Sequence, residues 1–145
     1  MACILALDVG TKTIGTARAT TDGCIPTPHS TLQRKGVRHD VARLMHLVED
    51  LKVEIVVVGL PYELDGTEGR SARLARQIGE ALGEASGVPI HYQDERYSTV
   101  VAEERLRMAG HNARRRKETI DQAAAAVILG DYLNRPSDSN SSPAD

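Results

Sequence analysis

Three groups of carboxylates stand where predicted elements end or begin, and they are the residues of this chain best suited to chemistry. Asp8 ends an apolar segment at residues 3–7, Asp94 and Glu95 end another, and Asp121 opens an alanine-rich segment. A charge taken out of water is costly unless it is paired, hydrogen-bonded or bound to a metal. The acids therefore indicate either structural ion pairs or a site for a hard divalent cation, which binds carboxylate and phosphate oxygens.

Two of these positions have structural explanations of their own. An aspartate that precedes a glycine turn, as Asp8 precedes Gly10, often caps that turn through its own backbone. Asp94 and Glu95 are neighbours, so in a strand they point to opposite faces, and at most one of them can look toward Asp8. A solvated strand end is the alternative for this pair. The residues alone leave the choice between Asp94 and Glu95 open.

Asp121 is the most informative of the acids. The residues three, four and seven positions after it are apolar and share its face of a helix: Ala124, Ala125 and Ile128. We expect that face to lie on a sheet, with the alanines allowing close approach, so Asp121 is interpreted as aimed inward. The structural alternative is a favourable interaction of Asp121 with the helix dipole. That interaction requires only a solvent-exposed acid and does not explain a position on the apolar face. Nearby cations could also pair with the acids: Lys12, Arg96 and Lys117.

Basic residues gather beside the acids and could hold a nucleic-acid backbone. The densest run lies just before Asp121 and consists of Arg114, Arg115, Arg116 and Lys117. Lys12, Arg70 and Arg96 are further candidates, and "LQRKGVRH" adds Arg34, Lys35 and Arg38. The net charge is only -2, yet a local basic face can bind phosphates. Instead of binding phosphate, residues 114–117 could form a solvated loop. Likewise, Arg70, Arg73 and Arg76 could simply form the solvent-exposed face of a helix.

The hydrophobic pattern predicts the elements that must position these residues. Strands are expected at 3–9, 14–20, 24–33, 54–61 and 88–96. Helices are expected over the apolar repeats 41–51 and 75–85, the second stopped by Gly87, and then at 98–109 and 119–133. The order is βββαβαβαα. The first, fourth and fifth strands should be parallel and central, with the other two antiparallel on one side. The acids then meet at the carboxyl edge, where such sheets bind ligands.

Composition limits the class of protein. The 145 residues are 41% hydrophobic and 26% charged, as expected for one globular domain, and contain neither Phe nor Trp. We expect one globular domain over 1–134 and a disordered polar tail over 135–145. No signal peptide or membrane-spanning segment is evident, and the two cysteines lack ligand spacing. A cytoplasmic location without membrane contact is therefore expected. The five histidines are scattered, and none is predicted to bind metal.

Four motifs taken together resemble one family. They are "LALDVGTKTIGTA", "VVVGLPYELDGTEG", "DERYST" and "IDQAAAAVIL", and the similarity covers residues 3 to 133. The family is YqgF/RuvX, bacterial relatives of the RuvC resolvase with a ribonuclease H-like fold. The resemblance implies a mixed five-stranded α/β sheet flanked by helices, and metal-binding, catalytic acids at Asp8, Glu95 and Asp121. Tyr97 and Ser98 replace the Leu and Thr of many relatives, at positions that hold no proposed ligand.

The resemblance implies a Mg²⁺- or Mn²⁺-dependent endonuclease, either a Holliday-junction resolvase or a nuclease that matures the 5′ end of pre-16S rRNA. The number of metal ions, one or two, stays open. Symmetric cutting of a junction would require a homodimer, whereas trimming an RNA end would not. A non-catalytic RNA- or ribosome-associated module of the same fold is the main alternative. "DVGTKT" is also similar to the phosphate-binding hairpin of actin-like ATPases, but those need two such domains.

Overall fold

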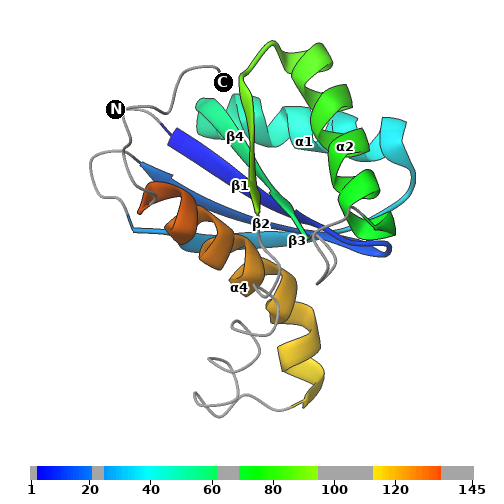
Figure 1. The fold of residues 1–145 in the computed structure, drawn as a ribbon, viewed down its shortest axis with the longest axis vertical. Coiled ribbons are helices and arrows are strands. Elements are labelled where there is room, and N and C mark those ends of the chain that lie inside the picture. Colours follow the sequence, from blue (N-terminus) through cyan, green and yellow to red (C-terminus); the bar gives the residue numbers. More distant parts are fainter. Residues whose placement is uncertain (1–2, 21–24, 62–68, 95–112, 135–145) are drawn as a thin grey trace.

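In the part of the chain that the structure describes, a five-stranded sheet is covered by helices on both faces (Figure 1). The computed structural model describes residues 3–20, 25–61, 69–94 and 113–134, and the side chains of 113–121 are not described. The strands are β1 (Cys3–Val9), β2 (Thr13–Thr20), β3 (Thr27–Gln33), β4 (Val53–Leu60) and β5 (Ile90–Asp94). The helices are α1 (Val37–Leu51), α2 (Arg70–Ser86) and α4 (Ala113–Leu133). The helix predicted at 98–109 and the tail at 135–145 lie outside the described residues.

The strand order is β3-β2-β1-β4-β5, and the predicted directions are confirmed. β1 pairs antiparallel with β2 and parallel with β4, and β5 is parallel to β4. One part of the prediction is wrong, because β5 lies at the edge of the described sheet rather than in its centre. β3 forms the opposite edge, where the missing N–H group of Pro28 is tolerated. No helix in the described part of the chain is long and apolar enough to cross a membrane.

Alternation along β1 divides the core into two layers. Leu5, Leu7 and Val9 pack with α1 and α2, whereas Ile4 and Ala6 pack with α4. Both faces of this strand are therefore covered, as its near-continuous apolar sequence predicts. α2 ends where predicted, because Gly87 adopts the left-handed conformation with φ of 75°.

α4 packs closely against the sheet at Gly59 of β4. A methyl group built on Gly59 would lie 2.4 Å from Cδ1 of Ile128 and 3.0 Å from its Cγ1. Ile128 is only 1% exposed, so it has little room to move away. A larger residue at position 59 must therefore displace the side chain or the helix.

We expect Gly59→Ala to lower the free energy of unfolding by about 1–3 kcal/mol, as overpacking of a buried contact does. Urea denaturation measures the loss. The double variant Gly59→Ala/Ile128→Ala should be less destabilised than the sum of the two single variants, because the second truncation removes the clash. Additive losses in this double-mutant cycle would show that the two residues do not compete for the same space.

Candidate functional site

Asp8 lies near the carboxyl end of β1, half-buried, on the face of the sheet that α4 covers. Its partner in β2 is Gly15, and the pairing of Leu7 with Val58 makes Gly59 the next position on β4. Both flanking positions are glycine, so neither neighbouring strand places a side chain beside the carboxylate on this face. The sheet thus presents Asp8 from a buried strand, between two positions that carry no side chain of their own.

The register of β5 distinguishes Asp94 from its neighbours. Tyr92 packs into the layer of α1 and α2, whereas His91 faces α4 and its Nδ1 lies 2.7 Å from the hydroxyl of Tyr132. Alternation then places Gln93 on the α4 face and Asp94 on the opposite one. Asp94 is therefore on the other side of the sheet from Asp8. Glu95 lies outside the described residues.

α4 carries the position of Asp121 toward the same edge. Ile128 contacts Gly59 near the end of β4, and Tyr132, further along the helix, contacts His91 near the start of β5. The helix thus runs antiparallel to these strands, and its first half extends past the carboxyl edge of the sheet (Figure 1). Position 121 falls on the helical face that buries Ala124 and Ala125, both 0% exposed.

The start of α4 differs from the prediction. The helix begins at Ala113 rather than Thr119, so the run 114–117 is helical and not a loop. Arginine, lysine and glutamate are good helix formers, and no glycine or proline interrupts 113–120. The positions of Arg114, Arg115, Arg116 and Lys117 therefore lie on the segment that extends past the sheet.

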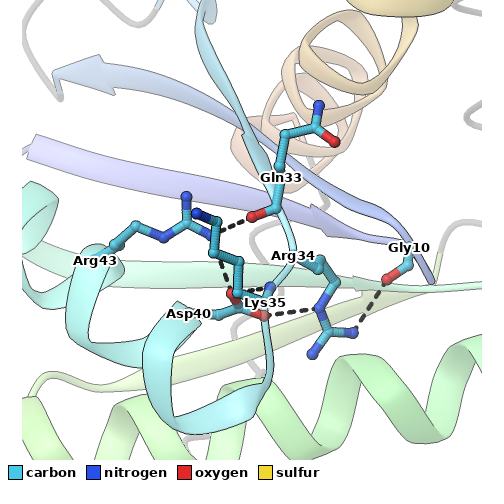
Figure 2. A network of polar contacts seen from close by, with 6 residues as sticks. All are labelled: Gly10, Gln33, Arg34, Lys35, Asp40 and Arg43. Atoms are coloured by element: carbon cyan, nitrogen blue, oxygen red, sulfur yellow. Dashed lines mark hydrogen bonds and ion pairs between the residues drawn. The ribbon is translucent and has the colours of Figure 1, made fainter.

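The turn that follows Asp8 is held by hydrogen bonds that Arg34 donates to it. Within the turn, Gly10 N donates to the carbonyl oxygen of Thr13 at 2.8 Å. The backbone N–H of Arg34 donates to the carbonyl oxygen of Lys12 at 2.8 Å, and its Nη1 donates to that of Gly10 at 3.1 Å. Figure 2 shows Arg34 reaching between Gly10 and Asp40. Lys12 itself is exposed in the turn.

Asp40, in the first turn of α1, holds Arg34 in place. The carboxylate is fully buried and accepts hydrogen bonds from Arg34 Nε at 2.9 Å, Lys35 N at 2.9 Å and Arg43 Nη2 at 3.0 Å. Arg43 also donates to the carbonyl oxygen of Gln33 (Figure 2). Burial acts to raise the pKa of Asp40, but these hydrogen bonds outweigh it and hold the pKa below its ordinary value.

Sequence reasoning missed this network. It grouped Arg34 with the phosphate-binding cations, whereas the structure pairs its guanidinium with Asp40. A signal was present, because Asp40 is an acid on the buried face of an amphipathic helix, beside Val41, Leu44 and Val48.

The remaining predicted residues are placed only in part. Arg70 is the first residue of α2 and is exposed, and Arg96 lies outside the described residues. Of the three predicted metal ligands, only Asp8 has a described side chain. Within the described ranges, no three His, Cys, Asp or Glu side chains come together as a metal-binding group. A carboxylate at a strand end is a ligand type that suits Mg²⁺ or Mn²⁺, so the described part of the site fits a hard cation without completing its ligand set.

Comparison with known proteins identifies relatives along nearly the whole chain. A family model described as "RuvX: Holliday junction resolvase" matches residues 2–135. A protein of Anaeromyxobacter dehalogenans named "Putative pre-16S rRNA nuclease" is 44% identical over 133 residues, which cover 90% of this chain and 96% of the relative. A protein of the same name from Picosynechococcus is 39% identical over 129 residues, covering 89% and 90% of the two chains.

Solved structures share the fold at low sequence identity. The T. thermophilus RuvC structure in complex with a Holliday junction substrate superposes with a TM-score of 0.62 at 14% identity, covering 92% of this chain and 95% of the other. At that identity the likeness concerns the fold alone, and it confirms the predicted architecture.

Proposed function

Because the chain belongs to the RuvX family of Holliday junction resolvases, we propose that it is a divalent-metal-dependent endonuclease that hydrolyses phosphodiester bonds in branched DNA or in an rRNA precursor. The observation that supports the proposal is the course of β1 and α4, which brings the end of a buried strand and the first half of the helix to the same edge of the sheet. Asp8 lies on the α4 face of β1, and α4 runs so that position 121 approaches the same edge.

We propose Asp8, Glu95 and Asp121 as the residues that hold Mg²⁺ or Mn²⁺. The register supports Glu95 over Asp94, because Asp94 lies on the face opposite to Asp8. When bound, the cation supplies a water molecule of lowered pKa and neutralises charge on the leaving oxygen. β1 contributes rigidity, since the fixed turn after Asp8 limits how far the carboxylate can move.

Basic residues near this edge are proposed to bind the nucleic-acid backbone. Lys12 is exposed in the turn directly after β1, and Arg70 is exposed at the start of α2. The helical run 114–117 and Arg96 complete the proposed set. Such contacts position the substrate without reading its sequence, so they suit an enzyme that recognises a shape.

The test compares cleavage of a labelled four-way DNA junction with cleavage of a labelled 5′ segment of an rRNA precursor, each with Mg²⁺, Mn²⁺ or EDTA. We expect metal-dependent cleavage that Glu95→Gln reduces by more than roughly 100-fold, since loss of a metal ligand exceeds the effect of losing its outer partners. Asp94→Asn is the matched control and should cleave like the wild type, because Asp94 lies on the other face.

The outcomes separate the substrates and the rival function. Paired symmetric nicks in the junction would identify a resolvase and require a dimer, which sedimentation measures. Cleavage of the RNA alone would identify a processing nuclease. Binding without cleavage of either substrate would contradict the proposal and favour the non-catalytic module. Loss of activity in Asp94→Asn but not in Glu95→Gln would overturn the ligand assignment.

A further inference from the structure

An open hollow on the outer side of α2 carries three arginines. Its volume is about 390 Å³, and the described residues that line it are Arg70, Arg73, Leu74, Arg76, Gln77 and Glu80. Arg70, Arg73 and Gln77 are exposed, and Arg76 is half-buried. Glu80 is the one acid among these described residues, which together carry more positive than negative charge. We call the set Arg70, Arg73, Arg76 and Gln77 the α2 arginine surface.

The placement of these arginines is unfavourable for the helix itself. The amino end of a helix carries partial positive charge, so acids stabilise the first turn and cations destabilise it. The first turn of α2 contains no acid, and its N-cap is Gly69, which has no side chain with which to cap the helix. Solvated helix faces usually alternate in charge, whereas here three arginines precede the first acid of the helix. An anionic ligand would offset this concentration of positive charge.

The α2 arginine surface extends toward the carboxyl end of β5. The guanidinium carbon of Arg76 lies 5.0 Å from the ring centroid of Tyr92, which fixes this arginine over the edge strand. Tyr92 is two residues before Asp94, a distance of about 7 Å along a strand. The surface therefore ends close to the point where the chain enters "DER". It lies on the face opposite to α4, so it is separate from the basic run 114–117.

We propose that the α2 arginine surface binds the phosphodiester backbone of the substrate as a second contact, on the far side of the catalytic edge from α4. Arg70 and Arg73 contact phosphates, Gln77 donates a hydrogen bond, and Arg76 with Tyr92 forms the border nearest the acids. A nucleic acid held on both faces passes over the carboxyl edge of the sheet. This inference rests on the proposed function, because it concerns the same substrate.

Binding is measured in EDTA, so that cleavage does not interfere, with the labelled four-way junction and the labelled rRNA-precursor segment over a range of salt concentrations. We expect Arg70→Gln/Arg73→Gln to weaken binding by roughly tenfold or more, as loss of charged hydrogen bonds does. The slope of log K against log[salt] should fall by about 1.4–1.8, the equivalent of two phosphate contacts. Arg76 is kept intact because it packs on Tyr92.

Two single variants complete the design. Arg18→Gln removes an exposed arginine of β2, which lies opposite Thr27 of β3 and away from the carboxyl edge of the sheet. This variant should bind nucleic acid like the wild type. Glu80→Gln removes the acid from the hollow and should tighten binding. Unchanged affinity and salt slope in the double variant would overturn the inference together with the proposed role of Arg70, whereas metal-dependent cleavage by the wild type would still support the proposed nuclease activity. Loss of binding in the double variant of a protein that never cleaves would support the surface and contradict the nuclease.

Discussion

Asp8→Asn should reduce metal-dependent cleavage by more than roughly 100-fold while leaving the protein folded. Asparagine has almost the same shape, so the pairing of this position with Gly15 in β2 is retained. The change removes one negative charge from a strand end at which we propose that two further carboxylates meet. Without that charge the site binds a divalent cation more weakly, because hard cations depend on anionic oxygen ligands.

Three measurements make this prediction specific. Titration with Mn²⁺ in the absence of substrate should show weaker binding by the variant. Thermal unfolding without metal should be close to that of the wild type, and binding of nucleic acid in EDTA should be retained. Asp50→Asn, which removes an exposed acid of α1, is the matched control for net charge. Cleavage at the wild-type rate by Asp8→Asn would exclude Asp8 as a metal ligand.

The order of the described elements along the chain and the directions of the strands could be predicted because they depend on local patterns. Continuous apolar residues identify β1 as buried on both faces, and the switch to helical spacing after residue 40 requires a crossover to β4. Gly87 ends α2 because it can adopt a positive φ. Each of these sequence patterns lies within the element that it predicts or within a few residues of it.

The arrangement of the site depends on register, which no local pattern contains. The sequence predicts that Asp94 and Glu95 point to opposite faces of a strand, but it does not say which face each takes. The face of Asp94 follows from the pairing of Gly59 with Gln93 and from the contact of His91 with Tyr132. The role of Arg34 was missed for the same reason. Its bond to Gly10 joins residues 24 positions apart, and a basic segment predicts an exposed cation unless its acidic partner is known.

The two glycines beside Asp8 show how the fold and the site constrain each other. Gly59 allows Ile128 to pack directly on β4, which sets the depth at which α4 lies on the sheet. The same helix runs toward the carboxyl edge of the sheet, where Asp8 lies near the end of β1 and where we propose that Asp121 is a ligand. A substitution that pushes α4 outward should therefore change the separation of the proposed ligands as well as the stability of the core.

Asp40→Ala should be the most destabilising single change among the charged residues described, with a loss of about 3–5 kcal/mol in the free energy of unfolding. Removing the carboxylate leaves Arg34, whose side chain is 9% exposed, without its ionic partner, and leaves the Lys35 N–H without its acceptor. A loss of this size is a large part of the total stability of a small domain. Because Arg34 also holds the turn after Asp8, cleavage should fall even below the melting temperature of the variant.

The effect of Asp40 should depend on pH in a defined direction. The pKa of Asp40 in the folded protein is held below the ordinary value of 3.8. The ionised carboxylate therefore stabilises the folded protein fully above pH 3.8. This stabilisation is lost as the pH falls through the lower pKa of the folded state. Urea denaturation of the wild type and of Asp40→Asn at neutral pH and below pH 3.8 measures the change. The difference between the two proteins should shrink in acid, whereas Asp50→Asn should show little difference at either pH. A difference that stays constant across this range would show that the network does not depend on ionised Asp40, and the turn after Asp8 would then be held by hydrogen bonds that a neutral side chain can also make.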